Sequence, residues 1–432
     1  MKEGAVVRNQ HDNPIIQSLV DVDVYKATMA HFALAMGHYE MPMVKLSLVC
    51  RTVGADLGHK IDIGQLREEI NHVKTLCITP NEMDFIERLP YISPLTDGPF
   101  YHYFANQLGQ FVSGTHVNSL PNVNIETHDD KLLIETEGYW FPTSWWETII
   151  LSIVSELRIR HEVKASGRTI EDYYRVGLTR LDEKIDFLLR HPEVRFMDFG
   201  TRRRASRAWH ERVLDRLLER IPGSVTGTSN INLARLRGLK PMGTQAHELF
   251  QVYSGIYHDP VENLIDSHNR VLRDWYHVYG GPLSIALTDT YGTRFFWKQF
   301  TPEQAVNWWG LRHDSADPFA FGEAAIAFYT ALRIDTRGKM IVFSDNLTAD
   351  LMVRLADRFR GAIDTGFGWG TNLTNDLGIP GVSLAMKVVK ANGHYTVKLS
   401  DNIAKSVGQE EDIARFKKIF GYTGGSVTPC LS

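Results

Sequence analysis

Cysteine is scarce in this chain of 432 residues, and Cys50, Cys77 and Cys430 are the only three. Their odd number and wide spacing argue against a disulfide framework and against a cysteine-rich metal site. The 17 histidines include no His-Glu-x-x-His pattern, so the sequence does not predict a zinc site of that kind. This cysteine usage fits a reducing compartment, and we expect a cytoplasmic protein.

Long apolar runs and a strong charge of one sign are also missing. Residues 1–13 are polar and lack the apolar core of a signal peptide. The most apolar helix candidate, residues 148–154, is soon interrupted by Glu156 and Arg158, so no segment approaches the roughly 20 residues that span a bilayer. The net charge is -4, from 47 basic and 51 acidic residues, which gives no basis for binding nucleic acid or an anionic membrane. Any anionic ligand must therefore be held by local groups.

The second half of the sequence contains a series of short apolar runs that each end in polar residues. These runs occupy residues 195–202, 241–248, 285–290, 311–315 and 341–346, and a glycine-rich segment follows at 365–373. Buried parallel strands have this continuous apolar pattern, and polar residues at their carboxyl ends are typical of an α/β barrel with its active site on one rim. Strand ends fall near residues 198, 228, 244, 289, 314, 345 and 368. Seven strands predict an irregular or incomplete TIM-like α/β barrel.

The first third of the sequence has a different pattern. Residues 123–136 predict two strands around a turn at 128–130, and Asp21 or Asp23 is placed to cap a helix that ends at Gly37. A long helix with one wide apolar face is expected from residue 144 to about 163. We therefore expect an α/β protein with an N-terminal α+β domain over residues 1–145, to which C-terminal residues could contribute. The α/β barrel would occupy residues 146–405, and a C-terminal segment residues 406–432.

The glycine-rich segment is the first candidate for chemistry. Gly366, Gly368 and Gly370 are spaced so that successive backbone amides can converge on a phosphate. Glycine also occurs at turns for conformational reasons alone. The position after one of the last strands favours phosphate binding, because barrel enzymes often hold phosphates there.

Three further strand ends carry charged side chains. Arg312 with Asp314 suits a polyanionic, hydroxylated ligand, since a guanidinium pairs with phosphate or carboxylate while a carboxylate accepts from sugar hydroxyls or holds a metal. A buried salt bridge between strands is the alternative. Within the charge run 201–204, Arg202 is the better ligand candidate because it lies nearest the strand end. His247, beside Glu248, could be a base, a phosphate acceptor, a metal ligand or only a packing residue.

Together these segments form an ordered set of motifs. They read DVYK at 23–26, DFGTRRR at 198–204, GTSN at 227–230, MGTQAHE at 242–248, LTD at 287–289, RHDS at 312–315, FSDNL at 343–347, GWGT at 368–371 and KLSD at 398–401. In this order they closely resemble the nicotinate phosphoribosyltransferases, a family of type II phosphoribosyltransferases. The resemblance covers residues from about 15 to 405. One departure is Ala316, where the family more often has glycine.

The resemblance implies the first step of NAD salvage from nicotinate. Such an enzyme joins nicotinate to phosphoribosyl pyrophosphate with Mg²⁺, releases nicotinate mononucleotide and pyrophosphate, and couples the reaction to ATP hydrolysis. It also implies four catalytic residues: His247, which is phosphorylated, Asp289, which orients it through the other ring nitrogen, Arg312, and Asp314, which binds ribose hydroxyls or Mg²⁺.

The resemblance further implies a set of substrate-binding residues. Phe199 would stack on nicotinate, Arg202 would clamp an anion with Arg312, and Tyr25 would cover the ring from the other subunit of a homodimer. The remaining members are Thr244 and Ser315, with Gly368, Gly370 and Thr371 on the 5′-phosphate.

Two other functions remain open. A nicotinamide phosphoribosyltransferase would use the same residues but should place an extra acid beside the ring. A regulatory barrel would bind phosphoribosyl ligands without turnover, although the intact His247, Asp289 and Arg312 argue against it.

Overall fold

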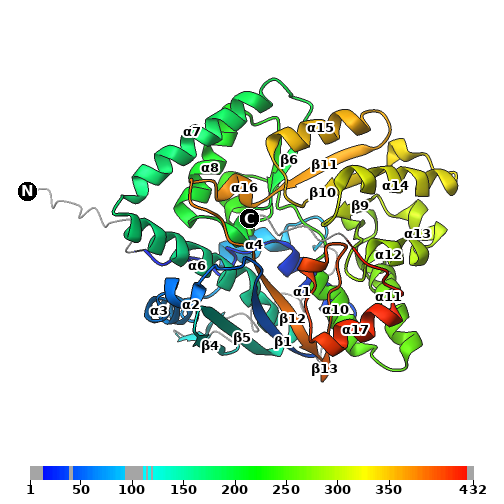
Figure 1. Ribbon diagram of the computed structural model, residues 1–432, viewed down its shortest axis with the longest axis horizontal. Helices are drawn as coiled ribbons and strands as arrows, with labels where there is room; N and C mark the ends of the chain where they lie inside the picture. Colours follow the sequence, from blue (N-terminus) through cyan, green and yellow to red (C-terminus); the bar gives the residue numbers. More distant parts are fainter. Residues whose placement is uncertain (1–12, 38–41, 93–109, 113–114, 118–119, 426–432) are drawn as a thin grey trace, which may run out of the picture.

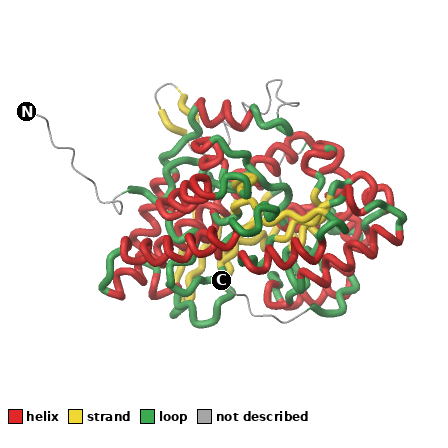
Figure 2. Tube along the Cα trace, turned by 90° about the horizontal axis from the view of Figure 1, so that it is seen from above, coloured by secondary structure: helices red, strands yellow, loops and turns green. Residues whose placement is uncertain are grey.

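The computed structural model describes residues 13–37, 42–92, 110–112, 115–117 and 120–425, so Cys430 and both extreme ends of the chain lie outside the described residues. Two large sheets organise these residues (Figure 1). Figure 2 shows most of the strands in the interior of the molecule with helices around them, and a short strand pair at its edge. Among the described helices, none combines the length and apolar character needed to cross a bilayer.

The first sheet is antiparallel and has the order β13-β12-β1-β5-β4. Its strands are β1 (Met43–Cys50), β4 (Val123–His128), β5 (Lys131–Tyr139), β12 (Leu384–Ala391) and β13 (His394–Tyr395). The alternating burial of β1 and β5 follows from one face packing on the core. Two strands from near the C-terminus thus lie beside the N-terminal strands, and Ser47 pairs with Lys387.

The second sheet is parallel and has the order β7-β6-β11-β10-β9-β8. Its strands are β6 (Phe196–Asp198), β7 (Val225–Thr228), β8 (Ile285–Leu287), β9 (Gly310–His313), β10 (Met340–Phe343) and β11 (Asp364–Trp369). The α/β class with an N-terminal α+β unit is confirmed. The six described strands form an open ladder with β7 and β8 at its edges, and no pairing between these two closes it into a barrel.

The remaining described elements are helices and one short hairpin. In the first half they are α1 (Tyr25–Ala35), α2 (Leu57–Lys60), α3 (Ile63–Val73), α4 (Pro80–Glu87), β2 (Gln110–Val112), β3 (Thr115–Val117), α6 (Trp140–Ser166), α7 (Ile170–Leu188) and α8 (Arg207–Arg220). In the second half they are α9 (Ile231–Arg237), α10 (His247–Ile256), α11 (Val261–Tyr279), α12 (Thr293–Gln299), α13 (Pro302–Asn307), α14 (Pro318–Ala331), α15 (Ala349–Phe359), α16 (Thr371–Thr374) and α17 (Glu410–Ile419).

Three expectations about these elements are wrong. The strand expected to end near residue 244 is only a single bridge between Thr228 and Pro241, because proline has no N–H for a ladder. The side chains of Asp21 and Asp23 do not cap α1, whose N-cap is Val24. Helix α6 begins at Trp140 rather than at residue 144, and Pro142 fits its first turn, where no N–H is needed.

A buried histidine on α11 gives a prediction about stability. His268 is 1% exposed and lies against Phe250, Phe295 and Phe296. Neither ring nitrogen has a hydrogen-bond partner among the described residues. Burial lowers the pKa of His268 from 6.5 to about 3. The folded protein therefore keeps this ring neutral and unsatisfied, which costs free energy.

We expect His268→Leu to increase the free energy of unfolding by about 1 kcal/mol at neutral pH and by more in acid. As the pH falls from about 6.5 towards 3, the unfolded chain binds a proton at His268 that the folded chain does not bind, so this residue makes stability fall with pH. Urea unfolding at several pH values would measure both effects. The control is His277→Leu, which changes an exposed histidine of the same helix. The prediction would be contradicted if the free energy of unfolding had the same value and the same pH dependence in the wild type and in His268→Leu.

Candidate active site

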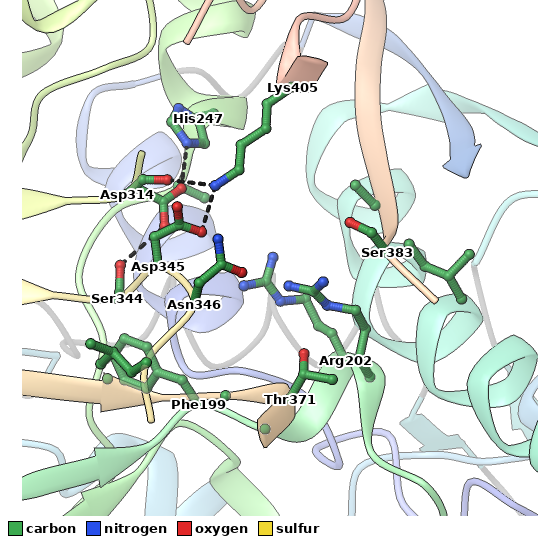
Figure 3. A pocket seen from close by; sticks show the side chains of 18 of the residues that line it. Phe199, Arg202, His247, Asp314, Ser344, Asp345, Asn346, Thr371, Ser383 and Lys405 are labelled. Atoms are coloured by element: carbon green, nitrogen blue, oxygen red, sulfur yellow. Dashed lines mark hydrogen bonds and ion pairs between the residues drawn. The ribbon is translucent and has the colours of Figure 1, made fainter. Parts of the chain in front are cut away.

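The carboxyl ends of the parallel strands surround a cavity of about 300 Å³. The first sheet also contributes to its wall, through Arg51 after β1 and through the start of β12. Ser383, just before β12, is on this side of the cavity (Figure 3). Its lining residues include nine that the sequence predicted, namely Tyr25, Phe199, Arg202, His247, Arg312, Asp314, Gly368, Gly370 and Thr371. The structure thus brings together residues that are up to 346 positions apart.

His247 is the first residue of α10 and is 5% exposed. Its Nε2 lies 2.9 Å from Oδ2 of Asp314, and its Nδ1 lies 3.0 Å from Oγ1 of Thr290. Burial, with Lys398 nearby, lowers the pKa of His247 to about 4. The imidazole is therefore neutral near pH 7. Because an ionised carboxylate can only accept, Nε2 carries the proton in this arrangement and Thr290 donates to Nδ1.

The position of Asp289 differs from the expectation. Its Oδ1 lies 3.6 Å from Nε2 of His247, so Asp289 approaches the same nitrogen as Asp314 and not the other one. Oδ2 of Asp289 accepts hydrogen bonds from Ser315 and Ser400. Burial alone would raise the pKa of Asp289, but Lys398 and His247 hold it below its ordinary value. Asp289 is a buried anion behind His247, and it does not line the cavity.

Arg312 and Asp314 form one hydrogen-bonded unit at the end of β9. Arg312 donates from Nη2 to Oδ1 of Asp314 at 3.2 Å, from Nε to Ser344 at 2.9 Å and from Nη1 to the carbonyl of Gln245 at 3.1 Å. Although burial opposes it, Arg312 together with His247 keeps the pKa of Asp314 well below its ordinary value. This pair therefore presents a fixed cation and a fixed anion to the cavity.

Phe199 lies against the glycine-rich segment. A Cβ atom added to Gly368 would come within 2.4 Å of the Phe199 ring. The backbone N–H of Phe199 also donates to the carbonyl of Trp369 at 2.8 Å. Gly368 is thus required for the close approach of the aromatic ring.

We expect Gly368→Ala to displace the Phe199 ring and to raise the KM for a substrate bound in this cavity about tenfold or more, since small misplacements in a site have large kinetic effects. Gly366→Ala is the matched control, because its added Cβ would meet neighbours only at 3.6 Å or beyond, an ordinary contact distance. Steady-state kinetics of both variants would test this. Similar kinetics for the two variants would contradict the role assigned to Gly368.

Tyr25 and Arg202 lie on the same side of the cavity. The guanidinium of Arg202 is 5.7 Å from the centre of the Tyr25 ring, and Arg202 contacts Asp23 at 3.3 Å and Glu147 at 3.6 Å. The Tyr25 hydroxyl donates to Glu147 at 3.2 Å. Tyr25 and Phe199 therefore line one cavity of one chain. This placement contradicts the expectation that Tyr25 reaches the site of a second subunit.

Two predicted substrate-binding residues do not line the cavity. The carbonyl of Thr244 accepts from Thr28 of α1 at 3.2 Å. Ser315 is 1% exposed and donates to Asp289. The neighbouring Ala316 has a φ of +69°, a conformation that glycine adopts more easily, which gives a physical reason for glycine at this position in related sequences.

The cavity also contains charged residues that the sequence analysis did not select. Lys405 donates to Asp345 at 2.5 Å and to the carbonyl of Asp314 at 3.0 Å. The others are Arg51, Arg203, Lys387 and Lys398. The DFGTRRR, FSDNL and KLSD motifs contain Arg203, Asp345 and Lys398, whereas Arg51 and Lys387 had no local signal.

The carboxylates of the cavity are suitable ligands for a hard cation. Asp314, Asp289 and His247 have ligand atoms within 4.8 Å of one another. Three hydrogen bonds already reach the Asp314 carboxylate, from His247, Arg312 and Ser344. A carboxylate has about four acceptor sites, so Asp314 has capacity for one more contact. This oxygen donor fits Mg²⁺.

Comparisons with known proteins agree with this geometry. Residues 194–424 match the model of the nicotinate phosphoribosyltransferase family, and residues 20–155 match that of its N-terminal domain. The chain is 31% identical to the nicotinate phosphoribosyltransferase of Porphyromonas gingivalis, with a TM-score of 0.79 over 94% of this chain and 100% of that one. It is 30% identical to the nicotinate phosphoribosyltransferase of Vibrio cholerae, with a TM-score of 0.82 over 95% of this chain and 94% of that one. It is 26% identical to a putative nicotinate phosphoribosyltransferase of Saccharomyces cerevisiae, with a TM-score of 0.79 over 95% of this chain and 100% of that one.

Proposed function

Because the chain belongs to the nicotinate phosphoribosyltransferase family, we propose that it transfers the phosphoribosyl group of phosphoribosyl pyrophosphate to nicotinate. The products are nicotinate mononucleotide and pyrophosphate. This reaction is the first step of NAD salvage from nicotinate. The observation that carries this proposal is the cavity itself, in which the Tyr25 and Phe199 rings lie near seven cationic side chains and the glycine-rich segment.

The chemistry of the reaction requires such a site. When pyrophosphate leaves the anomeric carbon, positive charge develops on the sugar, and the pyridine nitrogen must approach in line. Phe199 would stack on nicotinate, and Gly370 and Thr371 would bind the 5′-phosphate. Asp314 would accept hydrogen bonds from the ribose hydroxyls. Arg312 would stabilise the leaving pyrophosphate through the N–H groups that the protein does not use.

We infer that ATP drives the reaction through a phosphohistidine at His247. A neutral imidazole is a competent nucleophile towards the γ-phosphate, and the low pKa of His247 keeps the ring neutral. In the observed arrangement Nε2 is protonated and faces Asp314. Attack from this nitrogen requires the proton to move to Nδ1, where the Thr290 hydroxyl can accept it in a hydrogen bond.

Mg²⁺ would be held by Asp314 and would neutralise charge on the pyrophosphate. Asp345 lies at the same wall of the cavity and would assist. We also propose that the reaction requires ATP and that the protein is cytoplasmic.

We keep a homodimer as a prediction, but without a shared site. Sedimentation velocity at assay concentration would test the assembly. Because Tyr25 and Phe199 line the cavity of one chain, we expect that mixing Tyr25→Ala protein with Arg312→Ala protein does not restore activity.

An assay of product formation tests the function directly. We expect nicotinate mononucleotide and pyrophosphate from nicotinate, with a rate increase when ATP is present. Comparable kcat/KM for nicotinamide would instead support a nicotinamide enzyme, and no turnover of either base would support a binding protein. The cavity favours nicotinate, because Asp23 and Glu147, the acids beside Arg202, are not among its lining residues.

A further inference from the structure

Lys387 is a buried cation in the cavity wall, and few anionic or hydrogen-bonding groups compensate its charge. It lies on β12, is 8% exposed and lines the cavity. In the described part of the chain its one ion pair is with Glu147, at 3.8 Å, and no hydrogen bond to its ammonium group is found. A buried ammonium group without hydrogen bonds is costly unless an anion completes its surroundings.

The neighbouring cations are better compensated. Lys26 lies 2.6 Å from both Glu147 and Glu248. Arg202 lies between Asp23 and Glu147. Glu147 is therefore shared among three cations, and Lys387 is the most distant of them.

The other cations of the wall lie elsewhere or have partners. Lys405 pairs with Asp345, and Lys398 lies 3.6 Å from Asp289. Arg203 has no ion pair among the described residues, but its side chain is only half-buried and its carbonyl contacts Asn375, next to α16. This position is near the glycine-rich end of the cavity.

Lys387 is linked to the aromatic end of the cavity through Glu147. The carboxylate of Glu147 also contacts the Tyr25 hydroxyl and the Arg202 guanidinium. Lys387 and the Tyr25 hydroxyl therefore contact the same carboxylate, which places the ammonium group on the Tyr25 side of the cavity.

We propose that the Lys387 ammonium group pairs with the carboxylate of nicotinate and so sets the preference of the site for an anionic base. This role rests on the proposed function, and it makes Lys387 the residue that distinguishes a negatively charged base from a neutral one. Nicotinamide offers a neutral amide at this position and would leave the buried ammonium unpaired.

The electrostatics of the cavity support this role. Burial lowers the pKa of Lys387 to about 7, while Glu147 opposes this shift and Lys398, Arg202 and Arg51 add to it. At neutral pH the amine is therefore only partly protonated. A bound carboxylate favours the charged form, so nicotinate should bind together with a proton above about pH 7.

The first test compares Lys387→Met with the wild type. At saturating phosphoribosyl pyrophosphate, we expect the ratio of kcat/KM for nicotinate over nicotinamide to fall roughly ten- to a hundredfold. The KM for phosphoribosyl pyrophosphate should stay unchanged. The matched control is Lys390→Met, which changes a lysine of the same strand outside the cavity and should behave like the wild type.

A second measurement uses the wild type alone and does not depend on the folding of a variant. Calorimetry at pH 8 in buffers of different ionisation enthalpy should show proton uptake when nicotinate binds and none when nicotinamide binds. An unchanged base ratio, an equal loss with both bases, a raised KM for phosphoribosyl pyrophosphate, or no proton uptake would overturn the role of Lys387. Absence of any product from wild-type protein would instead contradict the proposed function.

Discussion

Replacing His247 by alanine is expected to abolish labelling of the protein by γ-labelled ATP and to remove the stimulation of product formation by ATP. Slow transfer without ATP should persist, because the reacting sugar is held by other groups, namely Arg312, Asp314 and the glycine-rich segment. In the wild type the label should be labile in acid and stable in base, as expected for a phosphorylated imidazole.

The geometry explains why this single side chain should matter so much. His247 is the buried histidine of the cavity wall that has carboxylates on one nitrogen and a hydroxyl on the other. His258→Ala provides the control, since His258 is also buried and follows the same helix but does not line the cavity. Wild-type incorporation of label into His247→Ala would show that the phosphate is attached elsewhere.

The parallel strands could be predicted because their signal is local. Each apolar run with polar residues at its carboxyl end contains its own evidence, and β6, β7 and β8 to β11 end within two residues of the predicted positions. The run before residue 244 has the same polar ending, but Pro241 limits its pairing to one bridge. Closure of the barrel would require pairing between strands that are far apart in the sequence, such as β7 and β8. A local sequence pattern does not show whether such a pairing forms.

The residues that the parallel sheet contributes to the candidate site could be predicted, whereas those from the antiparallel sheet could not. Strand-end residues of the parallel sheet converge because all parallel strands end at one edge. Arg51 and Lys387 come from the antiparallel sheet instead. Lys387 is one of two lysines in β12, and the strand has no regular alternation of apolar and polar residues. The local sequence therefore does not show that Lys387 is buried, and only the packing of the two sheets makes it part of the cavity.

Finer relations within the site depend on side-chain placement. The sequence predicted a strand before each of His247 and Asp289, of which only the second, β8, forms, and it could not show which ring nitrogen of His247 Asp289 approaches. Thr290, the next residue, contacts the nitrogen that had been assigned to Asp289. Neighbouring positions after a strand point in different directions, so a shift of one residue changes the partner.

Arg312→Lys is expected to lower kcat/KM for phosphoribosyl pyrophosphate roughly 10²-fold, because several groups of the site would lose their alignment together. The guanidinium donates to Ser344, to the Gln245 carbonyl and to Asp314 from three different nitrogens. An ammonium group keeps the charge but cannot span these three acceptors in one plane. The substitution therefore separates the effect of geometry from the effect of charge.

The consequences of this change extend to Asp314. Arg312 is the main opposing influence that keeps the pKa of Asp314 low despite burial, and Asp314 in turn accepts from His247. A misplaced cation should therefore disturb both the ribose contact and the orientation of the imidazole, so ATP-dependent labelling of His247 should also decrease. Arg354→Lys, at an exposed position on α15, is the control for a general effect of the exchange. Near-normal kinetics of Arg312→Lys, with unchanged labelling, would mean that Arg312 needs only its charge and that the hydrogen-bonded unit at the end of β9 does not position the reacting groups.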